Sequence, residues 1–158
     1  MVNPEVIIRD MDLEDIPRVI DLERQLFRNP WPEEVFFDEV LARTRYPFVV
    51  QANNEIIGYV MLWAKPTEGH ITNIAVDKKY QRKNIAKKLL YHILRLAAGL
   101  GLTRIVLEVR PSNLPAISLY ESFGFIHGEL RKGYYSNPSE DCLTMEKDIS
   151  ILETDKIE

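Results

Sequence analysis

The segment from residue 82 to residue 98 constrains the fold most, because it is the clearest helix in the chain. Its apolar residues recur at helical spacing and share one face. These residues are Ile85, Leu89, Ile93, Leu96 and Ala97. Gly99 and Gly101 follow, where glycine commonly ends a helix. Strand patterns flank the helix at 69–76 and 103–109, so the middle of the chain alternates strand, helix and strand.

The remaining segments follow in a mixed order. We expect a strand at 6–8, a helix that Asp12 caps and that ends before Asn29, a helix at 33–43, a hairpin of 48–52 and 56–63 around Asn53-Asn54, a short helix capped by Ser112 or Asn113, and strands at 125–131 and 143–147. A helix pair, an antiparallel meander and then alternating strands and helices favour an α/β (α+β mixed) fold. Its mixed sheet would carry helices on both faces.

Length and composition limit the class of protein. A chain of 158 residues suits one domain, expected at residues 1–148, and the acidic residues 149–158 are expected to form a flexible tail. The net charge of −4 argues against a general nucleic-acid binder. No apolar run reaches the roughly 18–20 residues that cross a bilayer, and the start lacks a signal-peptide pattern. The lone Cys142 cannot form an internal disulfide, which favours a reducing, cytoplasmic location.

A basic turn opens the long helix. Arg82, Lys83, Lys87 and Lys88 lie within seven residues. Cations at a helix N-terminus oppose the macrodipole, at a cost of a few tenths of a kcal/mol each. A bound phosphate would remove this conflict, since backbone N–H groups and basic side chains would both contact it. Solvated surface charge is the alternative. Neither G-x-x-x-x-G-K-[ST] nor G-x-G-x-x-G is present, so the usual phosphate motifs do not decide between them.

The turn Gln81-Arg82-Lys83-Asn84-Ile85-Ala86 resembles the pyrophosphate loop Q/R-x-x-G-x-G/A of the GNAT acetyltransferases, and within that superfamily the chain is most similar to the RimI and Ard-type N-terminal acetyltransferases. Further segments match in order and spacing: Gly69–Val76, Leu107-Glu108-Val109-Arg110, Ser112–Glu121, Phe123-Gly124-Phe125, and Gly133-Tyr134-Tyr135 followed by Glu140-Asp141. The resemblance implies the GNAT fold. This has a mostly antiparallel central sheet of about six or seven strands, helices on both faces and a splayed parallel strand pair.

Asn84 departs from the family pattern, which has glycine there. Glycine allows a positive φ or a close approach to phosphate. Asparagine also tolerates the left-handed region, so we expect the loop to form, with weaker coenzyme binding. Ala86 stands where the family accepts either glycine or alanine.

The resemblance implies acetyl-CoA as the cofactor, with its arm lying between strands 71–76 and 103–109. A backbone N–H near Ala75 or Val76 would stabilise the oxyanion. The implied cofactor-binding residues are Ile74, Ala75, Val76, Gln81, Arg82, Lys83, Asn84, Ile85, Ala86, Lys87, Asn113, Ala116 and Tyr120. Without the resemblance, Ile74-Ala75-Val76 would be plain strand core and Asn113 a simple helix cap.

The resemblance also implies the catalytic residues. Glu108 would act as the base through water, and His70, at the start of the neighbouring strand, would share that task. Tyr120 would protonate the departing thiolate. The alternatives are a salt bridge from Glu108 to Arg110 or a lysine, a partly exposed strand-end histidine, and a tyrosine that only packs on its helix. Three histidines without ligand spacing predict no catalytic metal, and His92 and His127 are expected to be packing or surface residues.

The acceptor is expected to be the α-amino group of a protein or peptide, bound as substrate by Phe27, Pro30, Trp31, Tyr134 and Tyr135. The paired tyrosines match those that line the family's peptide groove, although strand tyrosines packed at a sheet edge are the alternative. Alanine or serine is the expected first residue, with methionine as the rival. Two other functions stay open: acetylation of a lysine side chain, polyamine or small-molecule amine, and a non-catalytic acyl-CoA sensor. A monomer and a homodimer are equally compatible with the sequence.

Overall fold

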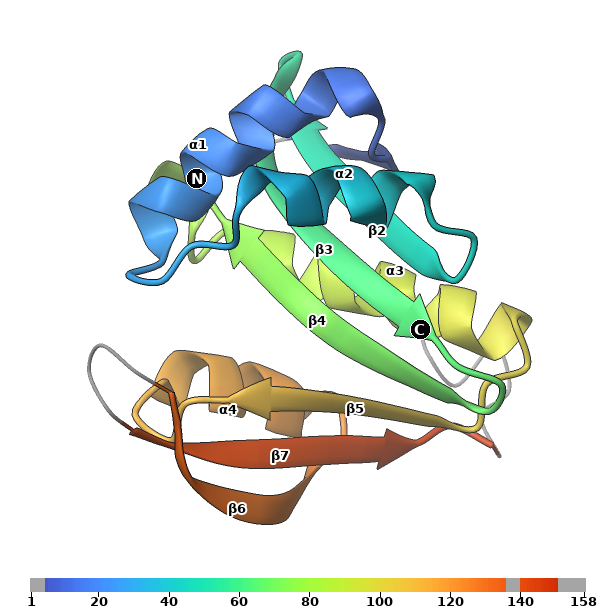
Figure 1. Cartoon of the computed structure of the whole chain (residues 1–158). Helices are drawn as coiled ribbons and strands as arrows, with labels where there is room; N and C mark the ends of the chain where they lie inside the picture. Colours follow the sequence, from blue (N-terminus) through green and yellow to red (C-terminus); the bar gives the residue numbers. More distant parts are fainter. Residues whose placement is uncertain (1–4, 136–139, 151–158) are drawn as a thin grey trace.

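A computed structural model describes residues 5–135 and 140–150. Seven strands form one sheet in the order β1-β2-β3-β4-β5-β7-β6, and β4–β5 is its parallel pair (Figure 1). The strands are β1 (Ile7–Asp10), β2 (Arg45–Ala52), β3 (Glu55–Ala64), β4 (Glu68–Val76), β5 (Arg104–Val109), β6 (Ile126–Tyr135) and β7 (Glu140–Asp148). The predicted mixed, mostly antiparallel sheet is confirmed.

Helices cover both faces of the sheet, as predicted (Figure 1). They are α1 (Ile16–Leu26), α2 (Glu33–Leu41), α3 (Ile85–Gly99) and α4 (Leu114–Ser122), with 3-10 turns η1 (Leu13–Asp15) and η2 (Lys78–Tyr80). The helices α1 and α2 pack with one face through a core that includes Phe36 and Tyr59. The helices α3 and α4 pack with the other face through a larger core that includes Leu89 and Ile105. The fold is therefore a three-layer sandwich with two cores.

Local sequence signals explain most element boundaries. Asp12 and Asp15 form a capping box at η1, which leads into α1. Asn53 and Asn54 both have positive φ, as a two-residue hairpin turn requires. The predicted helix start at Arg82 is wrong: α3 begins at Ile85, because Arg82 and Asn84 both lie in the left-handed region.

Other boundaries differ by a few residues. The second predicted helix ends at Leu41 instead of residue 43, and the last two strands extend further along their common ladder than expected. Of the predicted tail, Ile149 and Ser150 are described. Ile149 is buried and its amide donates to the Thr103 carbonyl. No helix in the described ranges is long and apolar enough to span a bilayer.

The parallel strands β4 and β5 separate partway along their length. Their pairing runs from Glu68–Arg104 to His70–Val106, and no later pair forms within the described residues. On its other side β4 pairs with β3, with an irregularity that leaves one extra residue, Thr72, between the paired positions Ile71 and Asn73. A bulge bends its strand, so β4 turns away from β5 (Figure 1). The splay that the resemblance implied is present.

Gly58 holds β3 close to β4. A Cβ at this position would lie 2.6 Å from the Ala75 carbonyl oxygen. We predict that Gly58→Ala lowers the free energy of unfolding by about 1–3 kcal/mol, because the backbone of β4 has to move. Chemical denaturation measures the change. Gly99→Ala is the control, since a Cβ there meets nothing within 4 Å. Equal stabilities of the two variants would contradict the prediction.

Candidate acyl-transfer site

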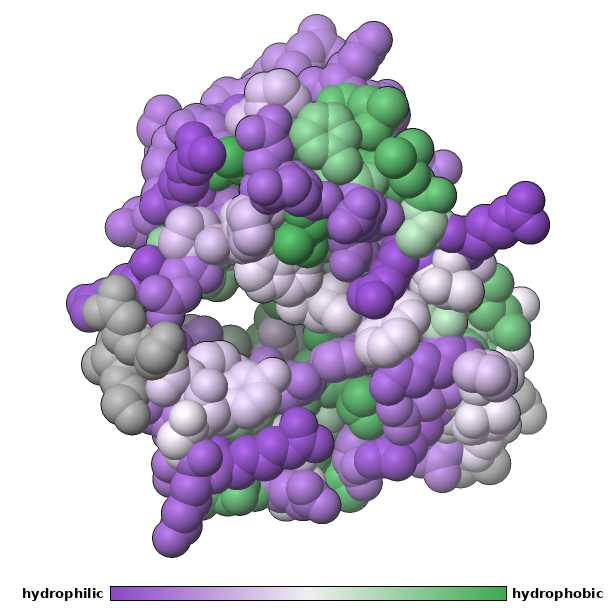
Figure 2. Space-filling view, in the orientation of Figure 1, coloured by the Kyte–Doolittle hydropathy of each residue, from purple (hydrophilic) through white to green (hydrophobic). Residues whose placement is uncertain are grey.

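A groove of about 1020 Å³ occupies the space between the separating strands. Its walls come from β4, β5, the start of α3, α4 and the loop between α1 and α2. Figure 2 shows an opening through the molecule in this view, at the position where Figure 1 draws the gap between β4 and β5. The groove is therefore open from both faces of the sheet.

One end of the groove is formed by the N-terminus of α3. Asn84 is the residue before the helix, with φ 63°, and its side chain makes no capping hydrogen bond. Amide groups at an uncapped helix start bind anions well, and Arg82 and Lys87 add positive charge at the wall. The Gln81 side chain donates to the Val76 carbonyl at 3.0 Å, which ties the loop to β4. These groups suit a phosphorylated ligand.

Most of the predicted cofactor residues line this groove. Those that do are Ile74, Ala75, Val76, Gln81, Arg82, Asn84, Ile85, Ala86, Lys87, Asn113, Ala116 and Tyr120. Lys83 is not among the lining residues. Asn113 also caps α4, because its side chain accepts from the Ala116 amide at 3.3 Å. The two roles considered for Asn113 are therefore compatible.

The backbone of β4 is available to a ligand beyond His70. Ile74, Ala75 and Val76 pair with β3 on one side and line the groove on the other. The side chains of Ile74 and Val76 contact the α3-side core and that of Ala75 the α1-side core. Strand packing and backbone recognition therefore use different atoms of the same residues. The edge amides fit an extended, amide-bearing arm.

Asn84 gives a test of the loop conformation. We predict that Asn84→Gly keeps or tightens coenzyme A binding, since glycine adopts positive φ without strain. Asn84→Ala is expected to weaken binding and to cost about 1–2 kcal/mol of stability, because alanine is strained in this region. Calorimetric titration with coenzyme A measures both variants. Asn53→Gly is the control, with positive φ in a distant hairpin. A large loss of binding in Asn84→Gly would show that the asparagine side chain itself is needed.

His70 and Glu108 meet across the gap. His70 Nε2 lies 2.6 Å from Glu108 Oε2, and both side chains are about four-fifths buried. Glu108 lines the groove, whereas His70 is not among the lining residues, and its ring lies 6.3 Å from that of Trp63. The sequence suggested Arg110 or a lysine as a salt-bridge partner of Glu108; the partner at 2.6 Å is His70 instead. The pair can share a proton next to a bound amine.

Tyr120 is buried on α4, 5% exposed, and lines the groove. Its ring packs 5.8 Å from that of Phe125. Burial raises the pKa of the hydroxyl to about 12, so the group stays protonated over the physiological range. Packing and a proton-donor role are again compatible.

Aromatic residues flank the other end of the groove. Phe27, Trp31 and Tyr135 line it, whereas Pro30 and Tyr134 do not. The rings of Tyr134 and Tyr135 contact each other edge-on at 5.0 Å. Burial, and then the charge of Glu108, raise the pKa of Tyr134 above its usual value. The two tyrosines therefore lie near the proposed base, and Tyr135 is the one that forms the wall.

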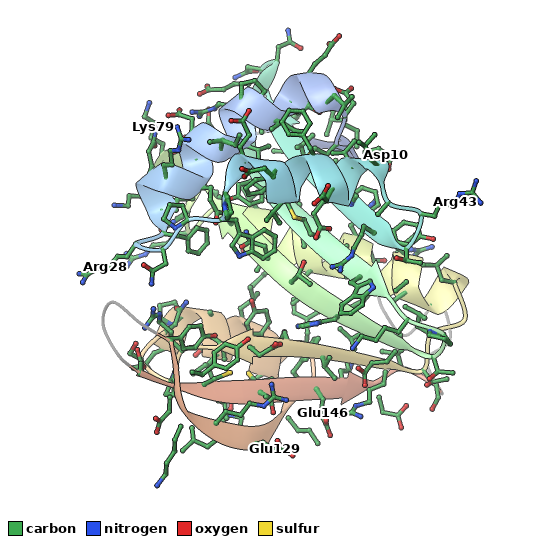
Figure 3. All side chains as sticks on the ribbon, viewed as in Figure 1. Asp10, Arg28, Arg43, Lys79, Glu129 and Glu146 are labelled. Carbon is green, nitrogen blue, oxygen red and sulfur yellow. The ribbon has the colours of Figure 1, made fainter. Side chains whose placement is uncertain are left out.

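Sequence reasoning missed several polar residues of the groove. Arg110 covers the Tyr135 ring at 4.4 Å and lies 3.5 Å from Glu140. Glu140 in turn accepts from the amide and hydroxyl of Ser112 at 2.8 Å each. Figure 3 shows the Arg28 side chain extending outward from the loop between α1 and α2, which also carries Phe27 and Trp31. Glu23 and Asn73 are further lining residues. Glu23 had a sequence signal, since it stands seven residues after Ile16 on the apolar face of its helix.

His92 and His127 are a packing and a surface residue, as expected from the sequence. His92 packs edge-on against Phe48 at 4.4 Å, and its burial lowers its pKa. His127 is exposed and pairs with Glu121. Cys142 is fully buried in β7. Within residues 5–135 and 140–150, no group of three or more metal-ligating side chains converges.

Comparison with known proteins gives consistent matches over most of the chain. The profile of the acetyltransferase (GNAT) family matches residues 16–125. A putative ribosomal protein bS18-alanine N-acetyltransferase of Bacillus subtilis is 34% identical over 139 residues, covering 87% of this chain and 92% of that protein. The ribosomal protein bS18-alanine N-acetyltransferase of Escherichia coli K12 is 32% identical over 147 residues, 91% of this chain and 98% of that protein. A crystal structure of the Escherichia coli ribosomal-protein-S18-alanine N-acetyltransferase superposes with a TM-score of 0.87 at 30% identity, over 95% of this chain and 97% of that one.

Proposed function

The chain belongs to the acetyltransferase (GNAT) family, and on that premise we propose that it transfers the acetyl group of acetyl-CoA to the α-amino group of protein or peptide N-termini. One observation carries the proposal. A single groove joins an anion-receptive helix end to a buried tyrosine, a carboxylate–imidazole pair and an aromatic wall. The relatives named above are called ribosomal protein bS18-alanine N-acetyltransferases, one of them as putative, and their similarity covers 87% and 91% of this chain.

The residues at the α3 end fit acetyl-CoA. The uncapped amides of Ile85 and Ala86, with Arg82 and Lys87, would hold the pyrophosphate. The free edge of β4 at Ile74–Val76 would accept the pantetheine amides, and one of its N–H groups would stabilise the oxyanion. When bound, acetyl-CoA supplies an acetyl group already activated as a thioester.

Glu108 would remove the proton that the amine has to lose. A peptide α-amino group has a pKa near 7.7–8, so about a tenth of it is neutral at pH 7. A carboxylate that acts directly or through one water is then sufficient. His70 would hold the Glu108 carboxylate in place through the 2.6 Å contact and carry the proton onward. The acceptor amine would thus face the Glu108 carboxylate, which is already hydrogen-bonded to His70.

Tyr120 would act at the sulfur of the leaving group. A phenol whose pKa is raised to about 12 does not readily release its proton to a thiolate whose thiol has a pKa near 8.5. Its first contribution is therefore a hydrogen bond to the sulfur as negative charge develops there. No covalent intermediate on the enzyme is required, because one groove would hold both substrates at the same time.

The acceptor end favours a peptide over a polyamine. A polycation would require a strongly acidic pocket, whereas Phe27, Trp31 and Tyr135 give this end of the groove an aromatic wall. The carboxylate Glu140 is already engaged by Ser112 and Arg110. Aromatic surfaces and hydroxyl groups suit the first residues of a peptide backbone, with alanine or serine as the expected first residue.

The proposal is tested by incubating the protein with acetyl-CoA and a mixture of peptides and polyamines, and by locating the acetyl group by mass spectrometry. We expect acetylated α-amino groups. Acetylated lysine side chains or polyamines would replace this proposal with acetylation of another amine. Coenzyme binding without any transfer would identify a sensor.

A further inference from the structure

Glu23 is a buried carboxylate for which the proposed chemistry has no use. It lies on α1, is 2% exposed, and lines the acceptor end of the groove. A charged side chain at such a position is costly unless donors surround it. Its neighbours therefore show what it does.

Three donors from three parts of the chain converge on Glu23. Its Oε1 accepts from the Tyr59 hydroxyl of β3 at 2.6 Å and from the Asn73 amide of β4 at 2.9 Å. Its Oε2 accepts from the Trp31 backbone N–H at 2.9 Å. Both carboxylate oxygens are engaged, so the group is a structural junction and not a free base.

The junction joins the two sides of the acceptor end. Trp31 belongs to the loop that carries Phe27, and its ring also packs 5.7 Å from that of Phe36. Asn73 follows the bulged position Thr72, at which β4 turns away from β5. Tyr59 anchors the carboxylate to the core, and burial followed by the charge of Glu23 raises the pKa of its hydroxyl well above the usual value. The hydroxyl therefore remains a donor.

We propose that Glu23 is a positioning residue that fixes the aromatic loop at Trp31 relative to the bulged strand β4, and so sets the width of the groove that receives the peptide. The inference rests on the proposed function, because it assigns Glu23 to the peptide end and not to the coenzyme end. It makes peptide affinity, and not the chemical step, depend on Glu23.

Glu23→Gln separates these effects. The glutamine oxygen can still accept from Tyr59 and Asn73, whereas its NH₂ group would face the Trp31 N–H as donor against donor. We expect the KM for a peptide to rise about tenfold, with kcat within about threefold and the acetyl-CoA dissociation constant within about twofold of wild type. A loss confined to kcat, or a loss of acetyl-CoA affinity, would overturn the proposal.

A matched control tests whether any buried carboxylate on this side of the sheet would do the same. Glu39 on α2 is 5% exposed, pairs with Arg45 at 3.3 Å and lies outside the groove. Glu39→Gln is expected to leave the peptide KM unchanged even if it alters stability. An equal rise of KM in both variants would show a general effect of buried charge and overturn the proposal.

A second readout does not depend on activity. The chain has two tryptophans, Trp31 and Trp63, so a Trp63→Phe background leaves Trp31 as the single reporter of the loop. Acrylamide quenching of Trp31 is expected to increase about twofold when Glu23→Gln is added, because the loop is no longer held to the carboxylate. Unchanged quenching would overturn the proposal.

Failure of the proposed function and failure of the Glu23 proposal give different results. If wild type acetylates no α-amine, the proposed function fails, while the quenching result still decides whether Glu23 holds the loop. If Glu23→Gln does not fold, Tyr59→Phe takes its place, since it removes the hydroxyl donor to Oε1 and leaves the Trp31 N–H bonded to Oε2. A rise in peptide KM of about threefold is then expected, and no rise would contradict the proposal.

Discussion

Replacing Glu108 with glutamine is expected to lower kcat by about 100-fold at pH 7 while leaving coenzyme A binding nearly unchanged, because the amine loses its proton acceptor. At higher pH the kcat of the variant should approach that of wild type, since a peptide α-amine of pKa near 7.7–8 is mostly neutral at pH 9. Steady-state rates at both pH values, with calorimetry for coenzyme A, make the measurement. Lost coenzyme binding would mean that Glu108 is structural.

The contact between His70 and Glu108 makes their effects interdependent. His70→Gln alone is expected to lower kcat by about tenfold, and the double variant should be little worse than Glu108→Gln, because both residues act through one hydrogen bond. The control is Glu121→Gln, which breaks an exposed Glu–His pair, Glu121–His127, at 3.3 Å. That variant should keep the wild-type rate. Fully multiplicative losses in the double variant would refute the shared role.

Tyr120→Phe is expected to lower kcat by about 100-fold or more, because the developing thiolate loses its hydrogen bond. The peptide KM and the coenzyme affinity should change little, since the phenyl ring keeps its packing against Phe125. Because burial raises the pKa of this hydroxyl to about 12, the wild-type rate should show no decline from tyrosine ionisation up to about pH 10.

A matched tyrosine makes that test specific. Tyr91 on α3 is outside the groove and accepts a hydrogen bond from Arg95 at 3.2 Å. Tyr91→Phe should leave kcat unchanged. An aminolysis rate that is equally insensitive to Tyr120→Phe would show that the thiolate departs without help from the protein.

The sequence predicted the layered fold well because local signals agreed with the packing. The capping box at Asp12 and the Asn53-Asn54 turn both formed as their residue types require. The start of α3 was missed, because apolar spacing does not register the positive φ of Arg82 and Asn84, which unwinds the first predicted turn. The start of α3 therefore depends on backbone conformation, which hydrophobic periodicity does not report.

Single site residues could be predicted from the sequence. Contacts between residues on different strands or helices could not. Glu108 and Tyr120 were expected in the groove and both line it. His70 was expected to share the base role from the neighbouring strand, but its direct contact with Glu108 was not foreseen, since it depends on the short parallel pairing at the base of the splay. Glu23 was overlooked because its place on an apolar helix face indicates a buried carboxylate but not its role, which depends on three donors from other parts of the chain.

The central claim is that the acetyl group goes to the N-terminal amine, and two peptides of identical sequence test it most directly. Each begins with alanine and contains one internal lysine, and one of the two has its α-amino group blocked by formylation. With acetyl-CoA and wild-type protein, the account predicts that the free peptide gains one acetyl group, located by fragmentation on its first residue, and that the blocked peptide gains none. Acetylation of the lysine at similar rates in both peptides would contradict it.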